Sequence, residues 1–153
     1  AHVRTALEDI KDIDTIERPE DRHRYLCIEY ENGAVVPSWL ASDGTLRLLA
    51  LTIPAYLADL EGTFLIEEPE NGVHPKALET VLQSLQSIYG SQVLIATHSP
   101  VALNMLEPCE ILCFAKDPTG ATDIVSGDNH PALQDWKQGE PDIGILFASG
   151  ILS

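Results

Sequence analysis

The 153-residue sequence predicts an α/β fold with a mostly parallel sheet and crossover helices. Two short apolar runs, TFLIE (63–67) and QVLIAT (92–97), have the continuity typical of strands that are buried on both faces of a parallel sheet. Between them, residues 74–90 carry apolar side chains at helical spacing, as a crossover helix does. A third run, EILCFAK (110–116), follows a short predicted helix at 99–106, and this strand–helix–strand order favours parallel pairing.

An N-terminal hairpin region, residues 1–41, is expected before the first of these strands. YLCIEY (25–30) and AVVPSWL (34–40) are predicted to form two strands joined by an Asn-Gly turn. The spacing of apolar residues within 2–13 indicates a helical segment before this hairpin.

Two longer helices are expected, one before and one after the strand at 63–67. Residues 42–62 predict a loop that runs into a helix, with a kink at Pro54. The helix over 74–90 has Pro75 in its first turn and Gly90 at its end, which are the residue types preferred there. One apolar stripe runs along this second helix and consists of Leu78, Val81, Leu82, Leu85 and Ile88.

The chain is strongly acidic, with 24 acidic and 9 basic residues and a formal net charge of −15. Such a field repels phosphate backbones, so the chain is expected to be a poor DNA-binding surface by itself. The chain can still take part in binding one nucleotide if another polypeptide segment supplies the positive charge. No apolar run reaches the roughly 18 residues of a membrane helix, and the charged first residues differ from a signal peptide. A cytoplasmic location is therefore expected.

Acidic and histidine side chains follow the first two predicted strands. Glu67 and Glu68 end one strand, and Thr97 and His98 end the other. Because parallel sheets place ligands at the carboxyl ends of their strands, we expect Glu68 and His98 to converge. The pattern fits a nucleoside triphosphate site, with one carboxylate on Mg²⁺, the next polarising the attacking water, and a histidine sensing the γ-phosphate. The plain alternative for the glutamates is a solvated acidic turn, and for His98 it is an ordinary histidine at the end of a strand.

Three motifs in this order resemble the C-terminal half of an ABC-type ATPase head domain. They are LASDGTLRLLAL (40–51), FLIEEPENGVHP (64–75) and VLIATHSP (93–100). The chain is similar to the stand-alone AAA-type ATPases akin to RecF, SMC-type and OLD proteins, many of which serve DNA maintenance or phage defence. The resemblance implies a partial P-loop NTPase fold in which a core at 42–116 follows the hairpin region and precedes a C-terminal tail at 117–153.

The resemblance assigns Ser42, Gly44 and Thr45 to the signature loop of this family. In the family that loop caps the γ-phosphate of the nucleotide bound by the opposing subunit, and a helix N-terminus with a hydroxyl and a glycine amide suits a phosphate. The plain alternative for Ser42 and Gly44 is a helix cap. Arg47, on the helix that follows, is expected either to reach across a dimer interface or to be solvated.

The resemblance also assigns the strand-end residues. Glu67 matches the metal-binding Walker B position, where Asp is more usual, and Glu68 matches the catalytic base. His98 matches the switch histidine, and ENGVHP (70–75) replaces the usual D-loop. ATP and Mg²⁺ are the cofactors that these assignments imply. His74 is expected to be structural.

The P-loop, G-x-x-x-x-G-K-[ST], does not occur in these 153 residues. The basic half of the site is therefore expected from an N-terminal P-loop half in the same or another chain, and the sequence is expected to be a C-terminal fragment or a split subunit. Alone, the chain should bind ATP poorly. It should also expose an apolar sheet edge and therefore tend to associate with other polypeptides. The other expected partners are a second copy of the chain and a nuclease or DNA-bound effector.

Three functions compete at this stage. The leading one is an ATP-hydrolysing switch module that dimerises around nucleotide. The second is a non-catalytic interaction module that retains only the dimer surface. The third is a metal-dependent hydrolase, whose metal ligands would come from Glu67, Glu68, Glu70, His74 and His98.

Overall fold

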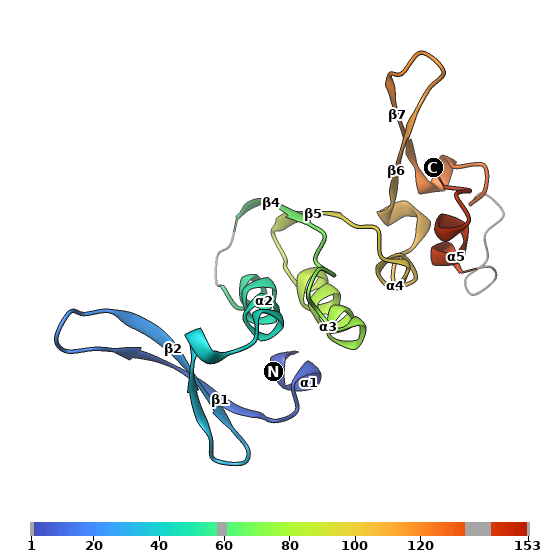
Figure 1. Ribbon diagram of the computed structural model, residues 1–153. Coiled ribbons are helices and arrows are strands. Elements are labelled where there is room, and N and C mark those ends of the chain that lie inside the picture. The colour runs from blue at the N-terminus through green and yellow to red at the C-terminus, as the bar shows by residue number, and fades with distance from the viewer. Residues whose placement is uncertain (1, 58–60, 134–141, 153) are drawn as a thin grey trace. The chain divides into compact units, whose positions relative to one another are not determined.

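The computed structural model describes residues 2–57, 61–133 and 142–152 (Figure 1). It divides into two compact units, residues 1–97 and 98–153, and each is considered by itself. The helices and strands of the first unit are α1 (His2–Ala6), β1 (Ile10–Glu17), β2 (Arg24–Tyr30), β3 (Val35–Pro37), α2 (Asp43–Thr52), β4 (Gly62–Glu67), α3 (Pro75–Gln86) and β5 (Ser91–Ala96). Those of the second unit are α4 (Pro100–Leu103), β6 (Leu112–Lys116), β7 (Thr122–Ser126) and α5 (Ile143–Ala148).

The N-terminal hairpin is confirmed and has one strand more than expected. β2 pairs antiparallel with β3, with Ile28 opposite Val36, and β1 pairs antiparallel with the other edge of β2. Gly33, at the tip of the β2–β3 turn, has a φ of +83°, a value that glycine adopts without strain. The helical segment expected over 2–13 is wrong beyond Ala6, because Ile10 already begins β1 and lies buried against β2.

Helix α2 lies between the hairpin and the parallel strands. Two adjacent residues anchor it, since Leu48 is buried in a cluster with Val81 of α3 and Leu49 in a cluster with Ile28 of β2. The helix ends at Thr52, and a 3₁₀ turn, η2 (Ile53–Tyr56), follows. The predicted kink at Pro54 is therefore a termination of the helix, because proline lacks the N–H that the next helical turn needs.

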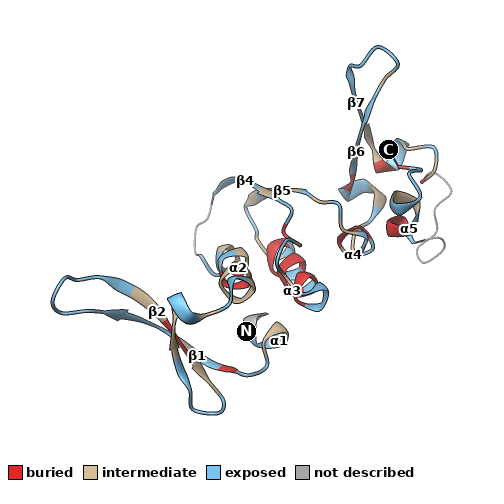
Figure 2. Ribbon diagram, in the orientation of Figure 1, coloured by how far each residue is buried: buried red, intermediate tan, exposed pale blue. Residues whose placement is uncertain are grey.

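Strands β4 and β5 pair in parallel, as predicted, with Phe64 opposite Val93 and Glu67 opposite Ala96. Helix α3 begins after His74, whose Nδ1 accepts a hydrogen bond from the amide of Lys76 at 3.2 Å. Figure 2 shows buried residues along one side of α3. That side packs with one face of the two strands in a single cluster, whose members include Leu48, Ile66, Val81, Leu85, Val93 and Ile95.

The prediction that the strand at 63–67 is buried on both faces is wrong for the structure as described. Leu65, on the face opposite Ile66, is 76% exposed, and Leu94 of β5 is 41% exposed. Helices α2 and α3 cover only one face of the pair. Parallel sheets are normally covered on both faces, whereas this face is exposed in the described residues.

The third predicted strand forms β6, which pairs antiparallel with β7 in a two-stranded sheet, with Phe114 opposite Ile124. Because β6 belongs to the second unit, its parallel pairing with the strands of the first unit stays a prediction. A turn joins β6 to β7, and the amide of Gly120 donates to the carbonyl of Asp117 at 2.9 Å. The second unit has a core of its own, formed by Leu103, Ile111, Leu133, Ile143 and Leu152.

In the described residues, none of the helices has the length and the apolar character that crossing a membrane requires.

Candidate nucleotide site

Two consecutive carboxylates lie where strand β4 ends. Glu67 is the last residue of β4, Glu68 follows it, and both are exposed. Because Glu67 is paired with Ala96 of the parallel strand β5, the carboxyl ends of both strands lie at the same edge of the sheet. Within the described part of the chain, neither carboxylate forms an ion pair. Both are therefore accessible to a cation, and exposed carboxylate oxygens are a donor set that suits Mg²⁺.

The backbone of Glu68 turns sharply out of the strand. Its φ of +45° lies in the left-handed region that residues other than glycine rarely adopt. Its amide donates to the carbonyl of Ala96 at 2.8 Å, and its carbonyl accepts from the amide of Asn71 at 3.0 Å. The side-chain amide of Asn71 also donates to Oε2 of Glu68. Both the backbone and the carboxylate of Glu68 are therefore held by hydrogen bonds.

The signature loop, Ser42–Thr45, forms the N-terminus of α2. Oγ of Ser42 accepts a hydrogen bond from the amide of Thr45 at 3.1 Å and lies 2.8 Å from Oγ1 of Thr45. The helix-cap role considered for Ser42 is thus confirmed. Ser42 is also exposed, so its cap leaves the positive end of the α2 dipole open to an anion.

The signature loop packs against the loop that follows Glu68. A Cβ atom on Gly44 would lie 2.7 Å from the carbonyl oxygen of Gly72, a distance that Cβ atoms do not tolerate. The glycine in the signature loop therefore has a packing reason within its own chain. A hollow of about 360 Å³ opens beside this contact, and its lining includes Ser42, Thr45, His74 and Lys76.

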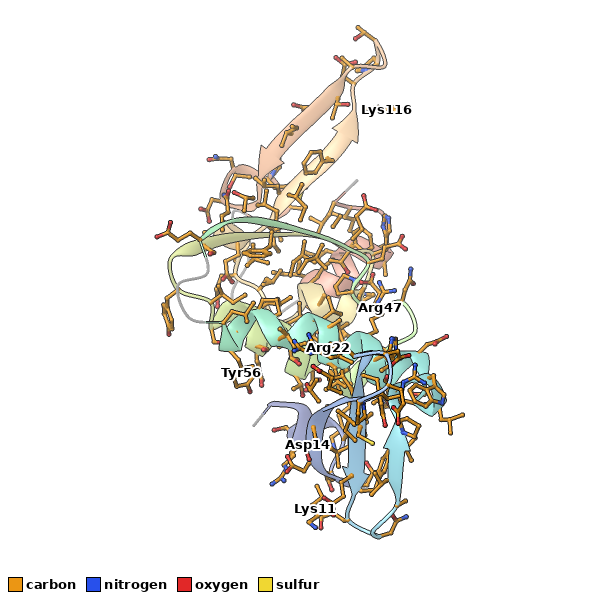
Figure 3. The ribbon with its side chains drawn as sticks, turned by 90° about the vertical axis from the view of Figure 1, so that its left-hand side faces the viewer. Lys11, Asp14, Arg22, Arg47, Tyr56 and Lys116 are labelled. Atoms are coloured by element: carbon orange, nitrogen blue, oxygen red, sulfur yellow. The ribbon has the colours of Figure 1, made fainter. Side chains whose placement is uncertain are left out.

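Arg47 connects helix α2 to the turn at Glu68 (Figure 3). Its Nη2 donates to the carbonyl of Glu68 at 2.8 Å and lies 3.5 Å from the carbonyl of Glu67. The structure shows a contact of Arg47 within its own chain, and the dimer contact considered for it stays a prediction. Sequence reasoning missed this contact because a backbone carbonyl acceptor has no side-chain signature.

The third glutamate of the acidic stretch has a different environment from the first two. Glu70 is half-buried, and its Oε1 accepts a hydrogen bond from the hydroxyl of Thr97 at 2.8 Å. Its carbonyl also accepts from the amide of Val73 at 3.1 Å, which closes the turn expected at ENG. Glu70 therefore links the segment after β4 to the residue that follows β5.

A family model described as "AAA domain, putative AbiEii toxin, Type IV TA system" matches residues 2–104, more than half of the chain. The chain belongs to this AAA-domain family. The match includes all three motifs found in the sequence and supports a nucleotide-driven ATPase module in general. A comparison with curated proteins gave no match.

A solved structure described as "Structural biochemistry of ATP-driven dimerization and DNA stimulated activation of SMC ATPases" is similar to this AAA domain. The TM-score is 0.64 at 17% sequence identity, and the match covers 91% of this chain and 90% of that chain. At this identity the likeness establishes the fold, which is the partial P-loop NTPase fold expected from the sequence.

His98 of the AAA domain is the first residue of the second unit. Its ring stacks on Phe147 of α5, with centroids 6.0 Å apart and planes at 30°. The parallel pairing of β4 and β5, on which its expected convergence with Glu68 depends, is confirmed. The convergence itself stays a prediction, because the two units are described separately.

The metal-dependent hydrolase needs several ligands at one point. Across residues 2–57, 61–133 and 142–152, no three His, Cys, Asp or Glu side chains are grouped so that they could hold a metal ion. Glu70 faces Thr97, and His74 caps α3, so two of the five residues considered have other partners. The hydrolase stays an alternative, because His98 and the three glutamates belong to units that are described separately.

Proposed function

We propose that this AAA domain is the Mg²⁺-facing half of an ATP-hydrolysing switch module. A half that carries a P-loop completes the site, and two completed modules enclose nucleotide between them. Hydrolysis opens the dimer and drives an effector, such as a nuclease or a DNA-bound partner, in DNA maintenance or phage defence. The similarity to an SMC ATPase structure concerned with ATP-driven dimerization supports the dimer by analogy of fold.

The observation that carries this proposal is the fixed position of Glu68 beside Glu67 at the carboxyl end of β4. Glu67 would hold Mg²⁺, and a bound Mg²⁺ would neutralise negative charge on the phosphates. Glu68 accepts a proton from the attacking water as the water oxygen bonds to the γ-phosphorus and the bond to the β–γ bridging oxygen breaks. The hydrogen bond from Asn71 orients the Glu68 carboxylate for this task.

The remaining predicted residues act on the γ-phosphate from two directions. His98 senses the γ-phosphate bound by its own module. Ser42, Gly44 and Thr45 cap the γ-phosphate bound by the opposing module, and the exposed N-terminus of α2 suits an anion at that place. This arrangement requires two copies for each complete pair of sites.

The half that carries the P-loop must supply positive charge and cover apolar surface. The chain's net charge of −15 makes ATP binding by this half alone unfavourable. The exposed face of β4 and β5, with Leu65 and Leu94, is the surface on which the P-loop half is proposed to pack.

The test is Glu68→Gln in the complete ATPase, which is this chain together with the polypeptide that supplies the G-x-x-x-x-G-K-[ST] loop. Glutamine keeps the size and the contact with Asn71 but accepts no proton, so kcat should fall by about 100-fold or more while ATP still binds and holds the dimer closed. Glu79→Gln on the exposed side of α3 is the matched control and should leave kcat unchanged.

Normal hydrolysis by Glu68→Gln would remove the proposed role of Glu68. If instead the wild-type protein hydrolyses no ATP and Glu68→Gln keeps its cellular function, the non-catalytic interaction module becomes the better description. Size-exclusion chromatography with ATP, compared between the two variants, measures the dimer directly.

A further inference from the structure

Arg47 contacts the backbone, and not the carboxylates, of two consecutive glutamates, Glu67 and Glu68. Its guanidinium donates to the backbone carbonyl of Glu68 at 2.8 Å and lies 3.5 Å from that of Glu67. In the described part of the chain it forms no ion pair with a carboxylate. Arg47 therefore stabilises the course of the backbone and does not neutralise the carboxylate of either residue.

The conformation that Arg47 stabilises is one that glutamate does not adopt readily. At a φ of +45°, the left-handed turn at Glu68 costs of order 1–3 kcal/mol in a non-glycine residue and persists only where neighbours impose it. The carbonyl of Glu68 accepts from two donors, the amide of Asn71 and Arg47. Of these, Arg47 alone comes from a distant part of the sequence, 21 residues away.

A second contact ties the same helix to the same loop. Gly44, in the first turn of α2, approaches the carbonyl of Gly72 so closely that a Cβ atom would lie 2.7 Å away. Arg47 thus joins α2 to the beginning of the loop from Glu68 to Gly72, and Gly44 joins α2 to its end. A shift of the signature loop relative to this loop would strain at least one of the two contacts.

We infer that Arg47 is a positioning residue that couples the signature loop to Glu68 within one chain. The inference rests on the proposed function and extends it, because the signature loop serves the opposing module's nucleotide while Glu68 serves its own. Through Arg47, the docking of α2 on the partner affects the backbone conformation of the turn at Glu68. A shift of the signature loop on engagement with the partner would therefore be transmitted to the Glu68 turn, which Arg47 already contacts in the single chain.

The test compares Arg47→Met and Arg47→Lys in the complete ATPase. Methionine removes both hydrogen bonds, and a displacement of a catalytic group by about 1 Å costs on the order of 100-fold in rate. We expect kcat to fall about 10- to 100-fold with the KM for ATP within about 2-fold. Lysine restores one donor and should recover part of kcat. Arg24→Met, which breaks an exposed ion pair with Glu17 on the hairpin, is the matched control and should leave kcat unchanged.

A double variant separates positioning from a general loss of structure. If Arg47 acts through Glu68, adding Arg47→Met to Glu68→Gln should lower the residual hydrolysis no further. An equal drop in both backgrounds would overturn the inference, as would a raised KM with unchanged kcat. Should Arg47→Met fail to fold, Arg47→Lys with a wild-type melting temperature and wild-type kcat would overturn it equally.

These outcomes also distinguish the inference from the proposed function. If Glu68→Gln hydrolyses ATP normally, the proposed function fails whatever Arg47 does. If Glu68→Gln is inactive but Arg47→Met turns over ATP at the wild-type rate, only the role of Arg47 fails.

Discussion

The hydroxyl of Thr97 donates a hydrogen bond to Oε1 of Glu70 at 2.8 Å. Thr97 follows strand β5, and Glu70 lies three residues beyond the end of β4, so the bond joins the two segments that leave the carboxyl edge of the parallel pair. The residue after Thr97 is His98, the predicted switch histidine. Glu70 is therefore a structural link beside the proposed site, and the two exposed glutamates before it are left for ligands.

Replacing Thr97 by valine should destabilise the chain. Valine keeps the shape of threonine but removes the donor to the half-buried Glu70, and hydrogen bonds to charged groups contribute about 1.5–3 kcal/mol. Because the site is only partly buried, we expect a loss of about 1–2 kcal/mol in the free energy of unfolding, measured by urea denaturation. Thr97→Ser keeps the hydroxyl and serves as the control. Equal stabilities of the valine and wild-type proteins would contradict this role.

The sign of the effect of Gly44→Ala tests the packing of the signature loop. Within a helix, alanine is more stable than glycine by about 1 kcal/mol, so an unobstructed Gly44 would make the substitution stabilising. The carbonyl of Gly72, 2.7 Å from the added Cβ atom, predicts the opposite. Overpacking of this kind typically costs about 1–3 kcal/mol, which denaturant unfolding resolves. A more stable alanine variant would show that the loop from Glu68 to Gly72 moves away freely.

The sequence was sufficient for the elements whose signals are local. The parallel pair, the helix capped at His74 and the hairpin around Gly33 all follow from periodicity and turn residues, and the structure confirms them. The predicted end of that helix at Gly90 is wrong, because α3 ends at Gln86. Helix α2 was placed correctly at its start, where Ser42 provides a cap, but its end at Thr52 depends on how Pro54 is accommodated.

The failures of prediction concern partners that lie far away in sequence. The exposure of Leu65 could not be predicted, because an apolar strand has the same sequence whether one or both of its faces are covered. Likewise, the contact of Arg47 with the Glu68 carbonyl depends on tertiary packing. The roles of individual site residues remain predictions that only measurements on the complete ATPase can test.

Adjacent residues of β4 should differ in how much the same substitution lowers the stability. Ile66 packs in the cluster that contains Val81 and Leu85, whereas Leu65 is 76% exposed on the other face. Ile66→Thr should cost about 1–3 kcal/mol of stability, because it removes a packed methyl group and places a hydroxyl among apolar side chains. Leu65→Thr should change the stability by no more than about 0.5 kcal/mol.

The same pair tests the proposed surface for the P-loop half. Leu65→Thr should weaken association with that half in a pull-down or calorimetric titration, although the variant itself is stable. A large loss of stability from Leu65→Thr in the chain alone would mean that this face is already covered.

The turn between β6 and β7 should show a pH signature at Asp117. The hydrogen bond from the hydroxyl of Thr119, at 2.6 Å, and the one from the amide of Ala121, at 2.9 Å, stabilise the charged carboxylate and lower the pKa of Asp117 below its ordinary value. Because the folded pKa lies below the unfolded one, the stability contributed by Asp117 is present above the unfolded pKa of about 3.9. It is lost as the pH falls through the folded pKa.

The pKa of Asp117 can be measured by an NMR titration of its carboxyl carbon. Thr119→Val removes the hydroxyl donor and should move the pKa of Asp117 upward, toward that of a free aspartate, whereas Thr119→Ser should leave it low. The valine variant should also lose less stability than the wild-type protein when the pH is lowered from 5 to 3, since it has less of this contribution to lose. An Asp117 titration that is identical in the valine and serine variants would show that the Thr119 hydroxyl does not stabilise the charged carboxylate, and that the backbone amides alone lower its pKa.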